Sequence, residues 1–371
     1  MDRMRLLAVA RKEVLQLRRD PRSLILAFLL PVALLVFFGY AITWDVRDIR
    51  LAVVDLDRTR ASRELTDAFL ASGRFTLAAV RARTADIGPL LDRGTVRMAL
   101  VVPRGFAADL GAGRTAEVQA IVDGSDANTA TIALGYTQAI AQQYSVRVLQ
   151  RRRQVGLPAS AETRVWYNEE LASRNMIVPG LIAVIMMIIA GLLTSLTIAR
   201  EWERGTMEQL AATPVTRAEV VIGKLLPYLG IGLVDVALCS VVGVLLFRVP
   251  FRGDPVFLAG ASFAFLTGTL GLGLLISAVA RTQLMATQIG LLSTFLPGLL
   301  LSGFMFAIDT MPVPLQALTY LVPARYFLVV TRGIFLKGIG PEVLWPQGLL
   351  MFAYGAVGLA LAVRAFRKEL A

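Results

Sequence analysis

Residues 199–224 read AREWERGTMEQLAATPVTRAEVVIGK, and this stretch decides how the rest of the chain is interpreted. An apolar run ends just before it, at Ile198, and a second apolar run begins near Val220. Charged side chains crowd the interval, at Arg200, Glu201, Glu203, Arg204 and Glu208. A charged, structured linker between two membrane spans is where a protein in the cytoplasm could grip a membrane protein.

The linker is predicted to form two short helical pieces with a bend between them. Glu201, Arg204 and Glu208 are spaced i, i+3 and i+7, which places them on one helical face. Gly205 permits the bend, because glycine adopts backbone conformations that other residues avoid. Charge alone would favour a solvated, salt-bridged connector over a docking surface.

The end of the linker carries signals for the next helix. Pro214 ends the second helical piece, since proline disfavours a helical conformation in the residue before it. Thr216 and Glu219 fit a capping box, in which each side chain satisfies a backbone N–H of the first turn. The next apolar helix is therefore predicted to begin there.

Composition places the chain in a membrane. Of its 371 residues, 56% are hydrophobic, and the mean hydropathy of +0.64 is well above that of soluble domains. Apolar runs of about 20 residues can cross a hydrocarbon core of roughly 30 Å. We predict a helical membrane protein with six spans, at 23–43, 176–198, 220–247, 256–279, 285–306 and 346–363. The proline-rich stretch 307–345 is predicted to be an external or re-entrant segment.

Basic residues predict the orientation. They flank the spans in segment 1–22, in the linker 199–219 and at the C-terminus, so we expect these three parts in the cytoplasm. Segment 1–22 is predicted to be an amphipathic helix with Leu6, Ala10, Val14 and Leu17 on one face. The net charge of +11 reflects mainly these membrane flanks, and we expect no nucleic-acid partner.

Region 44–174 is then predicted to be an extracytoplasmic α/β domain, inserted before the remaining spans in 175–371. Long loops cross the membrane regardless of their charge. Strands are predicted at Leu51–Asp55, Phe75–Val80, Met98–Val102 and Val118–Val122. Helices are predicted at Thr59–Ala71, Ala85–Arg93, Phe106–Gly111 and from Asp126 to about Arg153. The alternation indicates a largely covered sheet, but the strand order cannot be read from these residues.

Residue types exclude several kinds of chemistry. The sequence has no histidine and one cysteine, Cys239, so we expect no zinc site of the usual kind, no histidine proton relay and no catalytic residues. It also has no G-x-x-x-x-G-K-[ST] phosphate loop, because Gly223-Lys224 lacks the upstream glycine. Any active transport would therefore draw its energy from another polypeptide.

Asp235 is the only carboxylate deep within a predicted span. A charged group at the bilayer centre costs roughly 2.5–3.5 kcal/mol on insertion scales, so the side chain should face protein or water. It either lines a substrate path or pairs across a subunit interface, or it only hydrogen-bonds a neighbouring helix or lies nearer the end of the span.

The linker resembles, nearly residue for residue, the cytoplasmic coupling segment of ABC-2 type transporter permeases. The matching positions are Glu201, Glu203, Gly205, Thr206, Glu208 and Leu210, followed by Pro214, Arg217, Glu219, Gly223 and Lys224. The K-E…R-D-P pattern of the family's N-terminal helix is present as Lys12, Glu13, Arg19, Asp20 and Pro21. The resemblance implies that the chain couples to a separate ATPase through Glu201, Glu203, Arg204, Gly205, Thr206, Glu208, Pro214 and Arg217.

An S-G-F…P-A-R-Y spacing later in the chain resembles the family's external turn, which closes the outer mouth. The resemblance assigns this gate to Pro297, Gly303, Phe304, Pro323, Arg325 and Tyr326. The large domain after the first span, with its turn at Val122–Thr129, looks like the bacterial multidrug-efflux subgroup.

The resemblance implies an exporter subunit in a bacterial inner membrane, moving a drug-like, lipophilic or ionic substrate. Its expected partners are an ABC ATP-binding subunit, a second permease copy or a homologous permease, membrane lipid and a periplasmic adaptor. This chain would bind no cofactor, and its partner would use ATP and Mg²⁺. Two other classes stay open: a surface receptor or structural protein that works through its α/β domain, and a membrane enzyme, for which we find no catalytic constellation.

Overall fold

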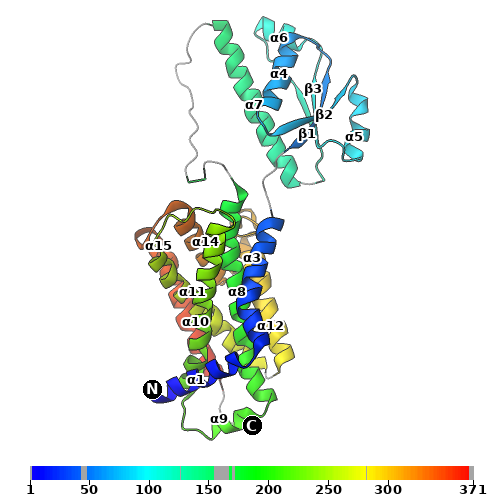
Figure 1. Ribbon diagram of the computed structural model, residues 1–371. Coiled ribbons are helices and arrows are strands. Elements are labelled where there is room, and N and C mark those ends of the chain that lie inside the picture. The colour runs from blue at the N-terminus through cyan, green and yellow to red at the C-terminus, as the bar shows by residue number, and fades with distance from the viewer. Residues whose placement is uncertain are drawn as a thin grey trace. The chain divides into compact units, whose positions relative to one another are not determined.

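The computed structural model describes residues 2–42, 48–125, 127–153, 167–168, 172–280 and 282–366. The chain divides into two compact units (Figure 1). We call Trp44–Arg164 the inserted unit, and Met1–Thr43 together with Val165–Ala371 the helical unit.

The inserted unit is an α/β fold built on one sheet. Its strands are β1 Ile49–Asp55, β2 Phe75–Arg81, β3 Met98–Val102 and β4 Gln119–Val122. Its helices are α4 Arg60–Ala71, a 3₁₀ turn at Thr84–Asp86, α5 Gly88–Asp92, α6 Phe106–Ala112 and α7 Ala127–Arg153. The strand order is β2-β1-β3-β4, with β1 parallel to β2 and β3 and with β4 antiparallel to β3. Each predicted strand and helix is present within two residues of its predicted place, except the predicted helix Ala85–Arg93, which is divided into the 3₁₀ turn Thr84–Asp86 and the short helix α5.

Both faces of the central strands β1 and β3 are covered, because alternate side chains of a strand point to opposite faces and both sets are packed, whereas the edge strand β2 is mostly exposed. Leu51 and Val53 of β1 lie in a core with Phe69 of α4, Phe106 of α6 and Tyr144 of α7. The intervening residues of β1 pack with α5, in a smaller core that contains Ala52, Val54, Ile87, Leu90 and Val101. Figure 1 shows α4 and α7 on one side of the strands and α5 on the other.

Asp57 ties the turn after β1 to the start of α6. Its carboxylate accepts hydrogen bonds from the backbone N–H groups of Gly105 at 2.8 Å and Ala107 at 3.0 Å, and from the hydroxyl of Thr59 at 2.7 Å. These donors, the Thr59 hydroxyl above all, hold the pKa of Asp57 below its usual value. These hydrogen bonds join two loops of the inserted unit, the turn after β1 and the loop before α6.

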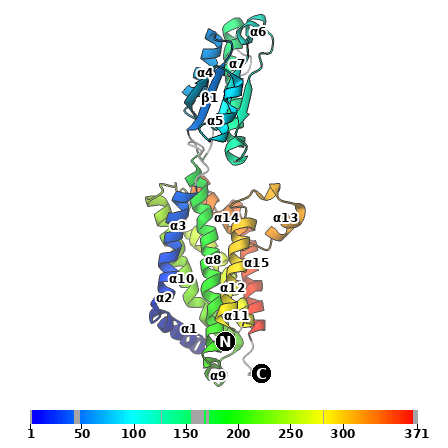
Figure 2. The same ribbon diagram turned by 90° about the vertical axis from the view of Figure 1, so that its right-hand side faces the viewer.

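The helical unit is a bundle whose long helices run alongside one another (Figure 2). Its first helices are α1 Arg3–Arg18, α2 Pro21–Leu24, the π-helical turn η1 Ile25–Leu29 and α3 Leu30–Ala41. The central helices are α8 Ser173–Glu203, α9 Thr206–Ala211, α10 Arg217–Leu245, α11 Pro255–Ala280 and α12 Gln283–Leu296. The last are η3 Pro297–Leu301, η4 Ile308–Thr310, α13 Val313–Thr319, α14 Pro323–Arg332, η5 Gly333–Lys337 and α15 Pro341–Ala365.

Among the described residues, five helices are long and apolar enough to cross a membrane: α8, α10, α11, α12 continued by η3, and α15. They coincide with five of the six predicted spans. A sixth would be added if the segments Val313–Thr319 and Pro323–Lys337, which meet at 77°, counted as one broken span. These bent segments fall inside 307–345, where prolines predict irregular structure.

Within the predicted first span, 23–43, the described residues are helical as far as Ala41 but do not form one long α-helix. A π-helical turn at Ile25–Leu29 separates α2 from α3, and the apolar helix here, Ala27–Ala41, is shorter than the other five. Pro31 has no N–H to donate to the preceding turn, so it favours a wider turn there. Pro297 begins a second π-helical turn at the end of α12, where a loosened helix is predicted.

The inner face of α1 differs in part from the predicted one. Val9, Glu13 and Leu17 are buried, whereas Val14, predicted to lie on that face, is exposed. Gly223 of α10 allows the close approach of α1, because a Cβ atom there would lie 2.8 Å from Val9 Cβ. A charged side chain, Glu13, thus occupies the middle of the contact between α1 and α10.

Candidate functional site

The charged linker is a helix end, a bend and a short, partly exposed helix. α8 ends at Glu203, and Gly205 has a φ of +68°, in the left-handed region that glycine tolerates. α9 follows at Thr206–Ala211, and Pro214 lies beyond its end. The predicted capping box is present, with Thr216 and Glu219 satisfying each other's backbone N–H groups at the start of α10.

The prediction that Glu201, Arg204 and Glu208 share one helical face is wrong. Glu201 lies on α8, Arg204 caps that helix, and Glu208 lies on α9 beyond the bend. The i, i+3, i+7 spacing implies a common face only where the helix is continuous, and Gly205 interrupts it.

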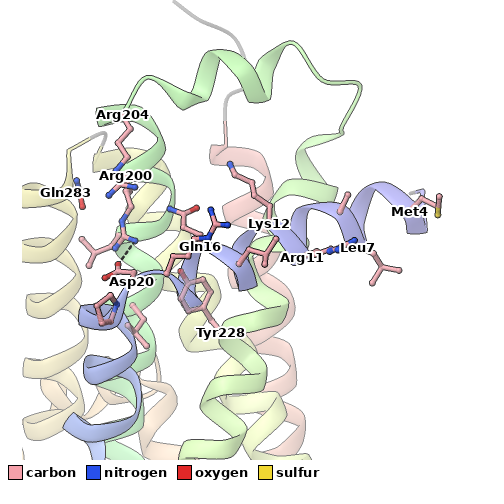
Figure 3. Close-up of a pocket in the computed structure, with 16 residues that line it drawn as sticks. Met4, Leu7, Arg11, Lys12, Gln16, Asp20, Arg200, Arg204, Tyr228 and Gln283 are labelled. Carbon is pink, nitrogen blue, oxygen red and sulfur yellow. Dashed lines mark hydrogen bonds and ion pairs between the residues drawn. The ribbon is translucent and has the colours of Figure 1, made fainter.

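α1 is fastened across this end of the bundle by polar contacts at both of its ends. The guanidinium of Arg200 pairs with the carboxylate of Asp20 at 3.2 Å (Figure 3). The backbone N–H of Asp2 donates to the carboxylate of Glu219 at 2.7 Å. The guanidinium of Arg5 donates to the backbone carbonyl of Pro214 at 2.6 Å. The N-terminal helix thus contacts both the end of α8 and the start of α10.

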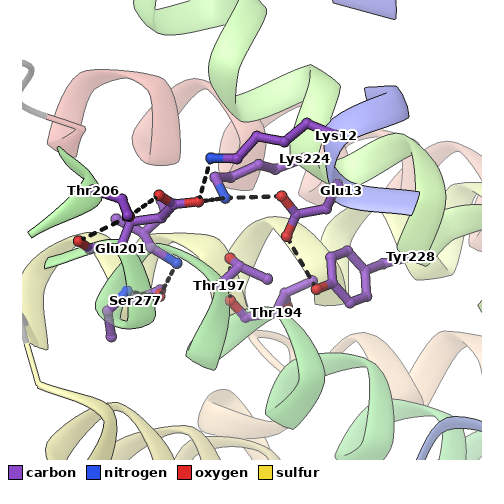
Figure 4. A network of polar contacts seen from close by, with 11 residues as sticks. Lys12, Glu13, Thr194, Thr197, Glu201, Thr206, Lys224, Tyr228 and Ser277 are labelled. Carbon is purple, nitrogen blue, oxygen red and sulfur yellow. Dashed lines mark hydrogen bonds and ion pairs between the residues drawn. The ribbon is translucent and has the colours of Figure 1, made fainter. Parts of the chain in front are cut away.

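At the centre of this end is a buried ion network (Figure 4). The ammonium of Lys224 lies 3.0 Å from the carboxylate of Glu13 and 3.2 Å from that of Glu201. The hydroxyl of Tyr228, one turn further along α10, donates to the other oxygen of Glu13 at 3.2 Å. Lys12, whose side chain is 50% exposed, reaches Glu201 from the solvent side at 2.9 Å.

The network joins three helices that are far apart in the sequence. Glu13 is on α1, Glu201 on α8 and Lys224 on α10, and each is at most 4% exposed. A charge in the interior is stable only when it is paired and hydrogen-bonded, so these three side chains hold one another in place.

Glu201 also holds the start of the exposed helix α9. The hydroxyl of Thr206 contacts one oxygen of the Glu201 carboxylate, while the lysines occupy the other. Glu203 accepts hydrogen bonds from the backbone and side chain of Gln283 at the start of α12. The hydroxyl of Ser277 on α11 accepts from the N–H groups of Ile198 and Ala199, each at 2.9 Å. The last turns of α8 are therefore connected to α9, α11 and α12.

The eight linker residues singled out in the sequence divide into two groups. Glu201 and Thr206 belong to the buried network, and Glu203 binds the start of α12. The other five lie on the exposed surface around α9: Arg204, Gly205, Glu208, Pro214 and Arg217.

The predicted external residues lie in and beside the bent segment. Phe304 is buried against α8, where a Cβ on Gly180 would lie 2.7 Å from its ring, and Gly303 has a φ of +83°. Pro297 starts η3, and Pro323 is the first residue of α14.

Arg325 and Tyr326 fasten the turn between α13 and α14. Arg325 lies 3.9 Å from the centroid of the Tyr320 ring and contacts the hydroxyl of Thr319. Tyr326 donates to the carbonyl of Tyr320 at 2.8 Å. The bend of this segment is thus held by its own side chains.

Asp235 is buried on α10 among apolar side chains. It borders a void of about 10 Å³ together with Met186 of α8 and Leu266 and Leu270 of α11. One carboxylate oxygen, Oδ1, has no hydrogen-bond partner among the described residues. The void is small and is lined by the chain's own helices, so it is not a wide polar passage.

Sequence reasoning missed Tyr228, Ser277 and Gln283 and gave Lys224 no structural role. The signal for Lys224 and Tyr228 is their spacing of four residues on one face of an apolar helix, which indicates a polar contact that the helix must satisfy. Ser277 and Gln283 carry no such signal, because ordinary polar residues at helix ends are common.

Comparison with known proteins gives one family. Residues 21–364 match the model of the ABC-2 family transporter proteins. The chain is 38% identical to the probable multidrug ABC transporter permease YbhS of Escherichia coli (strain K12), over 99% of this chain and 97% of that protein. It is 31% identical to the probable multidrug ABC transporter permease YbhR of the same strain, over 98% and 99% of the two chains. The inner membrane transport permease YhhJ is 29% identical, over 86% and 85%.

The buried network predicts unequal roles for its two lysines. Lys224→Met leaves Glu13 and Glu201 buried beside an apolar side chain, so we expect the free energy of unfolding to fall by about 3–5 kcal/mol. Lys12→Met removes a half-exposed partner of the same carboxylate, so we expect a loss of about 0–1 kcal/mol. Denaturant unfolding of the purified full chain measures both values.

The double variant Lys224→Met/Glu13→Gln is the control for charge. It removes one of the stranded carboxylates and should recover part of the stability that Lys224→Met loses. Equal losses for Lys224→Met and Lys12→Met would contradict the network as the source of stability.

Proposed function

Because the chain belongs to the ABC-2 family of transporter proteins, we propose that it is the membrane-spanning permease subunit of an ATP-driven exporter. It has no phosphate loop of its own, so ATP and Mg²⁺ would be used by a separate ABC ATP-binding subunit. The names of the two relatives as multidrug permeases support a drug-like, lipophilic or ionic substrate.

The observation that carries this proposal is the attachment of the exposed helix α9 to the buried ion network. α9 presents Glu208 to solvent, while Thr206 at its start contacts Glu201 in the network. A surface that transmits a conformational change from another protein must be accessible to that protein. It must also be joined rigidly to the helices that move. α9 and the network together meet both requirements.

In the proposed mechanism the ATPase docks on the surface around α9. Its movement on ATP binding displaces α9 and the end of α8, and Glu201 passes the displacement to α10 through Lys224 and to α1 through Lys224 and Glu13. Glu203 passes it to α12 through Gln283. The helices then change their packing and open a path for the substrate.

The bent segment between α12 and α15 is proposed as the external gate. Phe304 packs on α8, and the hydroxyl of Thr331 on α14 donates to the carbonyl of Pro179 on the same helix at 3.0 Å. A movement of α8 would therefore reach this segment directly. The proposal includes a second permease copy or a homologous permease, a periplasmic adaptor, an inner-membrane location and an extracytoplasmic inserted unit.

The proposed topology predicts opposite accessibility for two single cysteines. Ser72→Cys in the inserted unit and Thr213→Cys in the linker are made in a Cys239→Ser background, and both sites are exposed. We expect an impermeant thiol reagent to label Ser72→Cys in intact spheroplasts and Thr213→Cys only after permeabilisation. Labelling of both from the same side would exclude the proposed orientation.

Asp235 is proposed to take part in transport, because a buried carboxyl oxygen without a hydrogen-bond partner opposes folding. Asp235→Val removes that group, and we expect the free energy of unfolding to rise by about 1–3 kcal/mol while export falls. Thermal unfolding in detergent and export from reconstituted vesicles measure the two effects. Asp235→Asn keeps the shape and serves as the isosteric control. If Asp235→Val is more stable and exports at the wild-type rate, the residue has no role in transport.

Gly205 gives the test of coupling. Its φ of +68° strains a β-branched residue, whereas asparagine tolerates this region, and an added Cβ would meet no atom within 4 Å. We therefore expect Gly205→Val to change the angle of α9 and to lower ATP-driven export at least tenfold, and Gly205→Asn to stay close to wild type. Export and ATP hydrolysis are measured in vesicles that contain the chain and its co-purified ATPase.

Two results would count against the permease proposal. One is export at the wild-type rate by Gly205→Val. The other is the absence of any ATPase that co-purifies with the wild-type chain.

A further inference from the structure

A large open cavity lies at the charged end of the helical unit (Figure 3). Its volume is about 1220 Å³, and its walls come from α1, α8, α10 and α12. All of these helices belong to the helical unit, and the mechanism proposed above uses Gln283 and Arg204 of its lining but places no ligand in the cavity. Its lining combines two chemical features.

The first feature is an excess of positive charge. Five basic side chains line the cavity and one acidic side chain, Asp20, opposes them: Arg11, Lys12, Arg19, Arg200 and Arg204. Lys12 pairs with Glu201 and Arg200 with Asp20, but Arg11, Arg19 and Arg204 form no ion pair with a described residue. The Nε–H of Arg200 is buried and also lacks a partner among the described residues. Guanidinium groups with free donors are suited to a phosphate or carboxylate.

The second feature is an exposed apolar row on the same side of α1. Met4, Leu7 and Leu15 line the cavity and are 79%, 62% and 44% exposed. They are spaced with Arg11 at i, i+3, i+7 and i+11, so they follow one face of the helix. Leu193 and Leu196 of α8 add apolar surface to the wall. A soluble anion would leave this apolar surface in contact with water.

The position of the cavity matches a membrane interface. The apolar part of α8 ends at Ile198, and Arg200 and Arg204 follow within two turns. α1 lies across the same end of the bundle, as Figures 1 and 2 show, so its exposed apolar row runs beside the point where the spanning helices become charged. The headgroups of a bilayer lie at this depth, and basic pockets between spanning helices bind anionic headgroups there.

We propose that this cavity binds an anionic phospholipid of the adjacent leaflet. Arg11, Arg19 and Arg204 receive the phosphate and its headgroup. The acyl chains lie against Leu7 and Leu15 of α1 and against Leu193 of α8. The bound lipid joins α1 to α8 on the side of α1 away from Glu13, and it requires no ATPase.

The test uses the purified full chain in detergent, without an ATPase. Native mass spectrometry measures the binding of phosphatidylglycerol and of phosphatidylcholine with the same acyl chains. A basic residue near an anionic lipid contributes about a fivefold gain in affinity, so Arg11→Gln/Arg19→Gln should weaken phosphatidylglycerol binding roughly 25-fold. Arg3→Gln/Arg18→Gln removes the same charge from exposed positions of α1 that do not line the cavity, and it should change binding less than twofold.

Three further arms separate the possible outcomes. Arg11→Lys/Arg19→Lys keeps the charge and should retain most of the affinity, which excludes misfolding as the cause of a loss. Leu7→Gln/Leu15→Gln should weaken the binding of the long-chain lipid, because the acyl contacts are lost. Inorganic phosphate at millimolar concentration should not displace the lipid.

The proposal is overturned by any of three results. These are equal binding of the two lipids, an equal loss in the cavity variant and the exposed control, and displacement of the lipid by inorganic phosphate, which would make the cavity a site for a soluble anion. Each result concerns lipid binding alone, so it is distinct from a failure of ATP-driven export.

Discussion

The ion pairs of the buried Lys224 ammonium are the interaction on which this end of the molecule depends. It lies between the carboxylates of Glu13 and Glu201, and none of the three side chains is more than 4% exposed. Separating any two of them inside the protein would leave an unpaired charge in a medium that solvates it poorly. As long as water does not reach these ion pairs, α1, α8 and α10 can therefore move only together.

This constraint explains why two very different surfaces can lie side by side. On one side of the network, α9 and its neighbours present charged groups to solvent, which suits recognition by a protein in water. On the other side, α1 presents apolar side chains and arginines, which suits a lipid interface. The same helix, α1, contributes Lys12 and Glu13 to the network and Leu7 and Arg11 to the cavity.

The sequence predicts local structure well and long-range pairing poorly. The strands of the inserted unit are found where apolar runs lie between turn residues, and the capping box at Thr216 is found because it depends on residues three apart. The strand order depends on which strands pair across crossovers, which composition does not encode. The prediction that Glu201, Arg204 and Glu208 share one face failed because the left-handed backbone conformation of Gly205 changes the direction of the chain. Lys224 had no predicted role because its partner Glu13 is 211 positions away.

That separation also sets the order in which the protein can be assembled during its synthesis. Glu13 emerges from the ribosome 211 residues before Lys224, a delay of roughly 10–40 s at 5–20 residues per second. Throughout that interval α1 exists without the ammonium that neutralises its inward carboxylate, so its charged face must stay hydrated. α1 is thus made well before it can form its ion pair with α10, and a chain truncated before Lys224 would leave Glu13 without that partner.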